Sequence, residues 1–352
     1  MNMLLNGEWR TDTFQATNEE GAFERQTTPF RNWIAGSDVP NHVDAEPNDR
    51  FGAEAGRYHL YVSYACPWAH RALVVRALLG LEDAIDVSVV DPWRGEDGWQ
   101  FSPDKPGCTE DKLHGSDYLR ELYVEADPEA TCRVTVPVLW DTNEETIVNN
   151  ESREIIRMLS TAFRDVGTRD VDLAPEAIRD EVDEIMTAIY EPINNGVYRA
   201  GFATKQGPYD EAVDELFDAL DHWDDVLADQ RFLAGDQLTE ADIAMFTTLI
   251  RFDHVYHTTP TTFSKVSRGV TEPRPEKWDR ITEYENLHNY MRDMYQQPDV
   301  ADTVNMAHIT EHYACPMSPQ LHTHNPEDVD LGLNEEHNRG ELTNVPALKP
   351  RD

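Results

Sequence analysis

The chain has few cysteines, few basic residues and no long apolar run. Its 352 residues include four cysteines, Cys66, Cys108, Cys132 and Cys315. Four is too few for a disulfide framework, and no CxxC or paired Cys/His spacing predicts a zinc or other metal site. We therefore expect a reduced, cytoplasmic protein. The absence of any run of about 18 apolar residues argues against a membrane span, and residues 1–8 lack the pattern of a secretory signal.

Positively charged residues are also scarce. There are 67 acidic against 30 basic residues, and the formal net charge is −37. The acids occur in every segment, so the charge belongs to the surface, and the 8 Trp and 12 Phe in amphipathic patterns argue against disorder. A surface that repels polyanions argues against nucleic-acid binding. We interpret this acidic surface as that of a halophilic protein, because at about 1 M salt the Debye length is near 3 Å and the repulsion between the acidic side chains is screened.

The length predicts two domains, on a prior of about 150 residues each. Composition and periodicity divide the chain into an irregular arm, an α/β domain, an all-helical domain and an extended acidic tail, at residues 1–57, 58–165, 175–315 and 316–352. The arm offers candidate anchors in Phe23, Phe30, Trp33 and Ile34, and a proline-containing stretch at 258–280 reads as an inserted loop.

The α/β domain is organised around a cysteine. Tyr58 to Tyr64 has the aromatic and branched residues of a buried strand, and the apolar run that ends before Gly80 predicts a helix. Pro67 suits the first helical position. Cys66 therefore stands at a helix N-terminus, where the helix dipole and free N–H groups favour a thiolate. We predict that Cys66 is a nucleophile.

The rest of this domain has a thioredoxin-like order of strands and helices. We expect strands at 85–90, 133–141 and 146–149, a loop at 93–115, a helix to Tyr123 capped by Ser116, and a helix at 151–163. Proline inside a central strand is a contradiction unless it lies at a bend, at the strand start or in a cis bond. Val136-Pro137 lies where thioredoxin-like folds hold a cis proline opposite the helix-start cysteine.

From Pro175 onward the periodicity predicts helices, at 176–194, 209–227, 240–253 and 287–295. Thr239 and Asp242 form a capping box, which we assign to folding. Four histidines near the end, His308, His312, His322 and His324, fit no tight ligand spacing, so a solvated tail is favoured over a metal site.

Several motifs resemble the glutathione transferase superfamily, and within it the Xi class, the glutathionyl-hydroquinone reductases. They are Cys66-Pro67-Trp68-Ala69-His70-Arg71, Thr135-Val136-Pro137, residues 149–158, residues 194–203, residues 238–243 and residues 251–256. The resemblance covers about residues 58–315. It implies a thioredoxin-like domain followed by an all-α domain, and a homodimer.

The resemblance also implies an activity, the removal of a glutathionyl group from a conjugated hydroquinone. Cys66 would attack the thioether sulfur, and a second thiol would resolve the mixed disulfide. Because Ala69 stands where a resolving cysteine would be, the chemistry is monothiol. The cosubstrate would be glutathione, or γ-glutamylcysteine if the host is a halophilic archaeon, and no bound cofactor is implied.

Matching positions assign roles to further residues. Val136 and Pro137 would pair with the cysteinyl part of the thiol, Glu151 and Ser152 would bind its γ-glutamyl group, and Trp99 and Arg133 would line its pocket. Tyr198 and Tyr313 would hold or protonate the hydroquinone oxygen, with Tyr190 and Tyr256 as further candidates. The bend at Asn194-Asn195-Gly196 is expected to be exposed and to aim Tyr198 outward.

Two departures from the class pattern affect the acceptor side. The segment between Tyr256 and Tyr284 is longer than usual, and Ala314-Cys315-Pro316-Met317 replaces a basic segment. The other three cysteines are interpreted as small buried hydrophobes. Other functions stay open: an omega-like thioltransferase or dehydroascorbate reductase, a conjugating transferase, and a non-catalytic thiol- or quinone-binding module.

Overall fold

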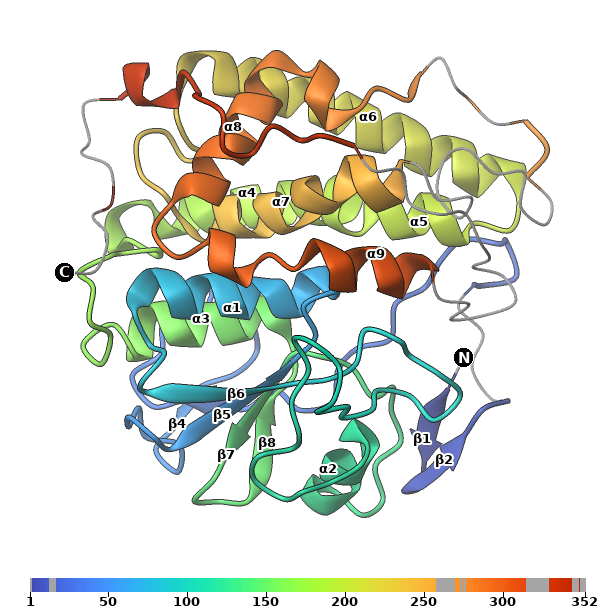
Figure 1. Ribbon diagram of the computed structural model, residues 1–352, viewed down its shortest axis with the longest axis vertical. Helices are drawn as coiled ribbons and strands as arrows, with labels where there is room; N and C mark the ends of the chain where they lie inside the picture. The colour runs from blue at the N-terminus through green and yellow to red at the C-terminus, as the bar shows by residue number, and fades with distance from the viewer. Residues whose placement is uncertain are drawn as a thin grey trace. The chain divides into compact units, whose positions relative to one another are not determined.

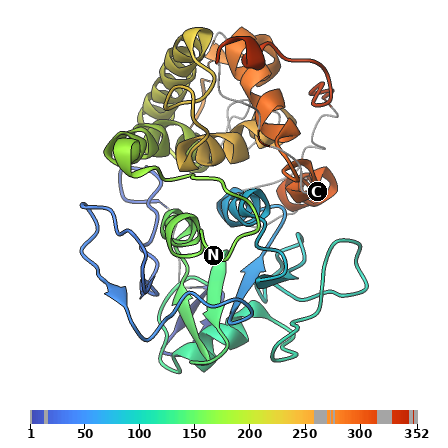
Figure 2. The same ribbon diagram turned by 90° about the vertical axis from the view of Figure 1, so that its left-hand side faces the viewer.

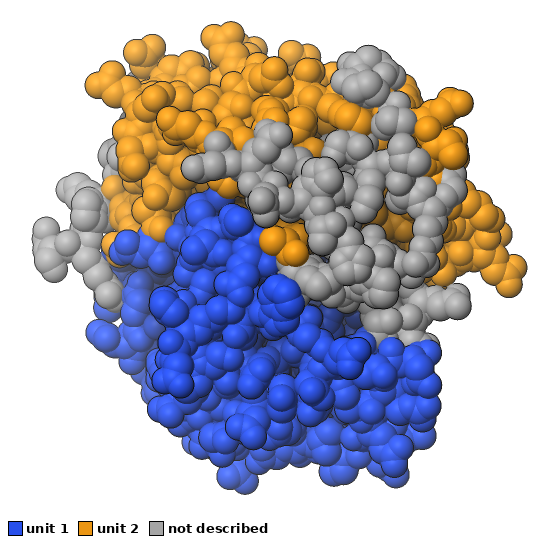
Figure 3. Space-filling model, turned by 45° about the vertical axis from the view of Figure 1, so that its right-hand side comes forward, with its two compact units in different colours: residues 1–14, 26–172, 302–312 blue, residues 15–25, 173–301, 313–352 orange. Residues whose placement is uncertain are grey.

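A computed structural model describes residues 2–12, 17–257, 270–272, 274, 277–314, 329–343 and 348. The chain forms two compact units (Figure 3). Unit 1 contains residues 1–14, 26–172 and 302–312, and unit 2 contains residues 15–25, 173–301 and 313–352. Among the described helices, none is long and apolar enough to cross a membrane. Most of the expected inserted loop at 258–280 lies outside the described residues. Cys315, His322 and His324 also lie outside them.

Unit 1 is built on a four-stranded mixed sheet in the order β6-β5-β7-β8. β5 (Tyr58–Val62) runs parallel to β6 (Ile85–Val89) and antiparallel to β7 (Val138–Asp141), which pairs antiparallel with β8 (Thr146–Asn149). α1 (Pro67–Leu79) and α3 (Ser152–Ala162) lie side by side on one face, and α2 (Leu119–Ala126) lies on the other (Figures 1 and 2). The thioredoxin-like prediction is therefore confirmed.

The helix after the cysteine begins and ends as the sequence predicts. Pro67 occupies its first turn, and Gly80 ends it at φ 65°, a left-handed conformation that glycine adopts without strain. The N–H groups of Gly80 and Leu81 donate to the carbonyls of Ala77 and Arg76, which satisfies the helix end. Because α1 is buried on nearly all sides, its position is fixed by packing.

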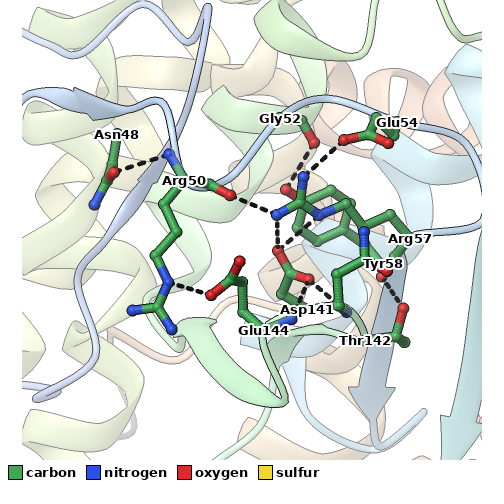
Figure 4. A network of polar contacts seen from close by, with 10 residues as sticks. Asn48, Arg50, Gly52, Glu54, Arg57, Tyr58, Asp141, Thr142 and Glu144 are labelled. Carbon is green, nitrogen blue, oxygen red and sulfur yellow. Dashed lines mark hydrogen bonds and ion pairs between the residues drawn. The ribbon is translucent and has the colours of Figure 1, made fainter.

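An ion-pair network ties the start of β5 to the end of β7 (Figure 4). The fully buried Asp141 accepts from the Arg57 Nε at 2.9 Å, and its other oxygen accepts from the backbone N–H groups of Asn143 and Glu144. Arg57 also contacts Glu54, whose side chain is 61% exposed. One buried carboxylate thus holds the central strand pair and shapes the β7–β8 turn.

The N-terminal arm contains short strands that the sequence did not indicate. They are β1 (Met3–Leu5) with β2 (Glu8–Arg10), and β3 (Trp33–Ile34) with β4 (Pro47–Asn48). Trp33 and Ile34 are fully buried, and Phe30 packs edge-on against Tyr123. The arm from residue 26 belongs to unit 1.

Unit 2 is helical in its described part. Its longer helices are α4 (Arg179–Ile189), α5 (Gly196–Phe202), α6 (Gln206–Asp229), α7 (Glu240–Arg251) and α8 (Glu285–Gln296). π-helical turns follow α4 at Tyr190–Asn194 and α7 at Phe252–Tyr256. Thr239 and Asp242 form the predicted capping box of α7. The predicted all-helical domain is confirmed.

Four local predictions are wrong. Tyr118, and not Ser116, is the N-cap of α2, and β7 begins only after Pro137 because proline cannot donate to the sheet. His308 and His312 lie buried in an unpredicted helix, α9 (Met306–Ala314), and their rings donate to the Pro106 and Pro92 carbonyls.

The fourth concerns the tail. Residues 329–343, expected to be extended, belong to unit 2, and Leu331 and Arg339 are buried there. Arg339 is fully buried and donates to the Leu227 and Gln230 carbonyls near the end of α6. Those carbonyls lack helical partners, which gives the arginine its place.

Candidate functional site

Cys66 is the N-cap of α1, four residues after β5 ends. Its backbone N–H donates to the Ser63 carbonyl at 3.1 Å, which folds the loop, and its own carbonyl accepts from His70 at 3.0 Å. The thiol is partly exposed, and Sγ lies 3.6 Å from the Val136 carbonyl oxygen. The predicted nucleophile therefore stands at a helix start with a reachable sulfur.

The segment opposite the cysteine is Val136-Pro137, and its peptide bond is cis as predicted. Val136 is buried, and Pro137 directly precedes β7. The carbonyl of the neighbouring Thr135 accepts from the Tyr123 hydroxyl at 2.8 Å, which anchors the segment on α2. This anchoring keeps extended backbone beside the thiol, where the backbone of a peptide can pair with it.

Glu151 and Ser152 open α3. Glu151 is the N-cap, and its carboxylate accepts weakly from the Arg153 N–H at 3.4 Å. Arg71, on α1, donates to the Ser152 hydroxyl at 3.5 Å and stacks 4.6 Å from the Trp68 ring. A carboxylate and a hydroxyl at a helix N-terminus can bind an ammonium and a carboxylate, as in a γ-glutamyl group.

Trp99 lies in the long ordered loop between β6 and α2. Its ring is 6% exposed and stacks on His312 at 5.3 Å. On the same ring lies the guanidinium of Arg94, 5.6 Å from the centroid. Arg133, the other predicted pocket residue, is half-buried three residues before Val136. Trp99 and Arg94 thus place an aromatic surface and a cation in unit 1.

The other described cysteines lie in different surroundings. Cys132 is buried and Cys108 is half-buried, with its Sγ 3.8 Å from the Val90 carbonyl. Burial raises the pKa of both thiols to about 11, so at neutral pH they stay protonated. Neither has the features of a nucleophile; Cys132 is buried as predicted, whereas Cys108 is only half-buried.

In unit 2, three tyrosine hydroxyls meet. The oxygen–oxygen distances are 3.1 Å from Tyr198 to Tyr256, 2.9 Å from Tyr198 to Tyr313 and 2.9 Å from Tyr256 to Tyr313. We call these residues the tyrosine cluster. Burial raises the pKa of Tyr256 and Tyr313 well above the ordinary value, so both remain proton donors.

The sequence predicted the members of this cluster and not its shape. Asn194, Asn195 and Gly196 are buried, so the expected exposed bend is wrong. Asn194 instead donates to the Ala244 carbonyl and the Thr248 hydroxyl, which holds the start of α5 on α7. Tyr190, also a candidate, is half-buried at the start of a π-helical turn, and its role stays a prediction.

Sequence reasoning missed Arg94. One signal was available: a cation directly after Trp93 and five residues before Trp99, in a chain poor in basic residues. As for metals, no group of three or more His, Cys, Asp or Glu side chains suited to an ion occurs within the described ranges.

A thioredoxin-like unit with a cysteine at a helix start, together with an all-helical unit, defines a class of thiol-handling proteins. Family models agree with both parts. The glutathione S-transferase N-terminal domain matches residues 65–162, and the glutathione S-transferase C-terminal domain matches residues 206–293.

Relatives narrow the class. The chain is 46% identical over 313 residues to glutathionyl-hydroquinone reductase YqjG of Escherichia coli, covering 89% of this chain and 90% of the relative. An Xi-class structure from Natrialba magadii is 58% identical, with a TM-score of 0.82 and 97% of each chain covered. The glutathione-bound structure of the Escherichia coli protein is 42% identical, with a TM-score of 0.79, covering 96% of this chain and 99% of that chain. The chain belongs to the Xi class of the glutathione transferase superfamily.

Proposed function

We propose that this protein is a glutathionyl-hydroquinone reductase that acts through Cys66. The observation that carries the proposal is the partly exposed thiol at the start of α1, 3.6 Å from the Val136 carbonyl and beside a cis proline. The similarity to a relative named for this activity, along nearly its whole length, supports the same reaction.

The reaction has two steps. In the first, the Cys66 thiolate attacks the sulfur of the conjugate, an S–S bond forms, and the C–S bond breaks. The electron pair of that bond passes to the hydroquinone ring, where the ring oxygen shares the charge, and one proton completes the released hydroquinone. In the second, a free thiolate attacks the mixed disulfide, releases a disulfide and restores Cys66. In the net reaction the ring carbon is reduced from C–S to C–H, while the thioether sulfur of the conjugate and the sulfur of one free thiol are oxidised to the released disulfide.

The thiol cosubstrate is proposed to lie along unit 1. Val136 would pair with its cysteinyl backbone, Glu151 and Ser152 would bind the γ-glutamyl ammonium and carboxylate, and Trp99 and Arg133 would line its pocket. The buried and half-buried positions of these residues are compatible with such a pocket. Since Ala69 cannot resolve the disulfide, the second thiol must come from solution.

The tyrosine cluster is proposed to serve the hydroquinone. A phenol suits this role because its pKa is close to that of the phenolate that develops on the acceptor. The raised pKa values of Tyr256 and Tyr313 keep their protons available at neutral pH. Tyr198 and Tyr313 are the proposed acid groups, with Tyr256 as their hydrogen-bond partner.

The identity of the thiol is proposed to follow from the host. A net charge of −37 supports a halophilic origin, and the similar Natrialba magadii structure is compatible with an archaeal one. In such a host we propose that γ-glutamylcysteine replaces glutathione. Thiol chemistry of this kind suits a reducing environment, which supports a cytoplasmic location as part of the proposal, and the superfamily resemblance predicts a homodimer.

The test is turnover of a glutathionyl- and a γ-glutamylcysteinyl-hydroquinone in molar salt, each with its matching thiol. The wild-type protein should release hydroquinone from both, faster with γ-glutamylcysteine. Cys66→Ser should lose nearly all turnover, because the nucleophile is removed, while Cys108→Ser should keep it. A clear preference for glutathione contradicts the thiol assignment alone.

Equal turnover by Cys66→Ser and the wild-type protein would contradict the proposed mechanism. If Cys66→Ser binds thiol with unchanged affinity and the wild-type protein shows no turnover, the chain is a binding module. Turnover of dehydroascorbate far above that of the conjugates would favour the omega-like thioltransferase.

A further inference from the structure

One edge of the Arg94 guanidinium has no hydrogen-bond partner among the residues that the structure describes. The residue is half-buried, but its Nε and Nη2 atoms are fully buried and have no hydrogen-bond acceptor within the described part of the chain. A buried guanidinium with unused donors is costly, since the desolvated N–H groups lose water without gaining a partner. Such a group indicates an anion that is bound when the protein works.

Nε and Nη2 form the guanidinium edge that binds carboxylates in two other arginines of this protein. Arg231 donates from Nε and Nη2 to the two oxygens of Asp293, at 2.7 and 2.8 Å. Arg31 uses the same two atoms on Glu154. This parallel two-bond geometry matches a carboxylate and not a single sulfur or hydroxyl. The open edge of Arg94 is therefore shaped for a carboxylate.

The surroundings of Arg94 belong to the thiol side of the proposed site. Its guanidinium lies 5.6 Å from the centre of the Trp99 ring. Burial is the main cause that lowers the pKa of Arg94 to about 10, and negative charge at Cys66 partly opposes this lowering, so the two groups interact electrostatically. Arg94 is thus still a cation at neutral pH and lies near the thiol-binding residues.

We propose that Arg94 binds the C-terminal carboxylate of the thiol cosubstrate through its Nε and Nη2 edge. This inference rests on the proposed function. A γ-glutamyl thiol carries two carboxylates, and Glu151 with Ser152 is assigned to the γ-glutamyl end. The remaining carboxylate, on glycine in glutathione or on cysteine in γ-glutamylcysteine, requires a cation. Arg94 supplies one where this chain lacks the basic segment after Tyr313.

The test compares each thiol as the free acid with its C-terminal ethyl ester, which blocks only that carboxylate. The probes are glutathione and its glycine ester, and γ-glutamylcysteine and its cysteine ester. In the wild-type protein we expect kcat/KM to favour the acid by about 10- to 100-fold, mainly through KM. In Arg94→Gln this preference should nearly vanish. Arg10→Gln, which removes an exposed arginine of unit 1, should keep it.

Equilibrium binding of the same four ligands to Cys66→Ser gives the acid-to-ester ratio without turnover. An acid-to-ester ratio near one, both in the wild-type turnover assay and in this binding assay, overturns the role of Arg94. An acid-to-ester ratio of kcat/KM in Arg94→Gln that equals the wild-type ratio also overturns it. The binding ratio can be measured even if the conjugates are not turned over. Absent turnover contradicts the proposed function, whereas turnover without discrimination contradicts only the assignment of Arg94.

Discussion

At the scale of single residues, the site is a set of donors and acceptors whose protonation is controlled by burial. Burial raises the pKa of the Cys108 and Cys132 thiols, while Cys66 keeps a partly exposed sulfur at a helix start. The three cysteines thus have identical side chains in different surroundings. Its position after β5, at the start of α1, distinguishes the proposed nucleophile from the other two cysteines.

The tyrosine cluster gives a prediction at this scale. Tyr198→Phe keeps the ring and removes one of three mutually bonded hydroxyls. If this hydroxyl donates to the developing phenolate, kcat for a conjugated hydroquinone should fall by about 10- to 100-fold, while KM for the thiol stays unchanged. Tyr295→Phe, on α8 and outside the cluster, is the matched control. Unchanged kcat in Tyr198→Phe would remove this tyrosine from the chemistry.

What the sequence revealed at this scale depended on local signals. Cys66, Pro67 and Gly80 mark a helix by their own backbone preferences, so they could be interpreted without tertiary information. The meeting of Tyr198, Tyr256 and Tyr313, which are far apart in the sequence, depends on packing. The family resemblance named these three tyrosines as candidates, but only the structure shows that their hydroxyls contact one another.

At the scale of elements, strong local patterns were predicted well and weak ones were not. The strand at 58–62 and the helices at 67–79, 152–162 and 240–251 have clear hydrophobic runs with caps. The arm strands β1 to β4 have only two or three residues each, too short for a periodicity. No helix was predicted at α9, and its histidines were interpreted as part of a solvated tail because their spacing fits no tight ligand pattern, yet their rings donate to backbone carbonyls.

The β5–β7 ion pair gives a prediction for the sheet. Asp141→Ala should lower the free energy of unfolding by roughly 3–5 kcal/mol, because it leaves the buried Arg57 without its main partner. Glu54→Ala removes the exposed partner of the same arginine and should cost about 1 kcal/mol or less. Urea unfolding at constant salt measures both losses. Equal losses in the two variants would mean that burial does not set the strength of this network.

At the scale of the whole molecule, charge is the dominant property. The excess of 37 negative charges follows from 67 acidic and 30 basic residues. Several acids have local partners, such as Asp141 with Arg57 and Asp293 with Arg231, but the basic residues are too few to pair with all of them. Most of the repulsion must therefore be screened by ions.

Stability should accordingly depend on salt. Raising KCl from low concentration to about 1 M shortens the Debye length to near 3 Å, so we expect Tm to rise by many degrees. Thermal unfolding followed by circular dichroism checks this. A Tm that is flat or falling across that range would contradict a halophilic surface, while leaving the reaction at Cys66 untouched.

The most direct test of the central claim is a single turnover without free thiol. The protein is mixed with one equivalent of glutathionyl-hydroquinone, and released hydroquinone and protein mass are followed together. Monothiol chemistry at Cys66 predicts one hydroquinone released per chain and one glutathionyl group on Cys66, removed when thiol is added. Hydroquinone release with no adduct, or an adduct on Cys108 or Cys132, would contradict it.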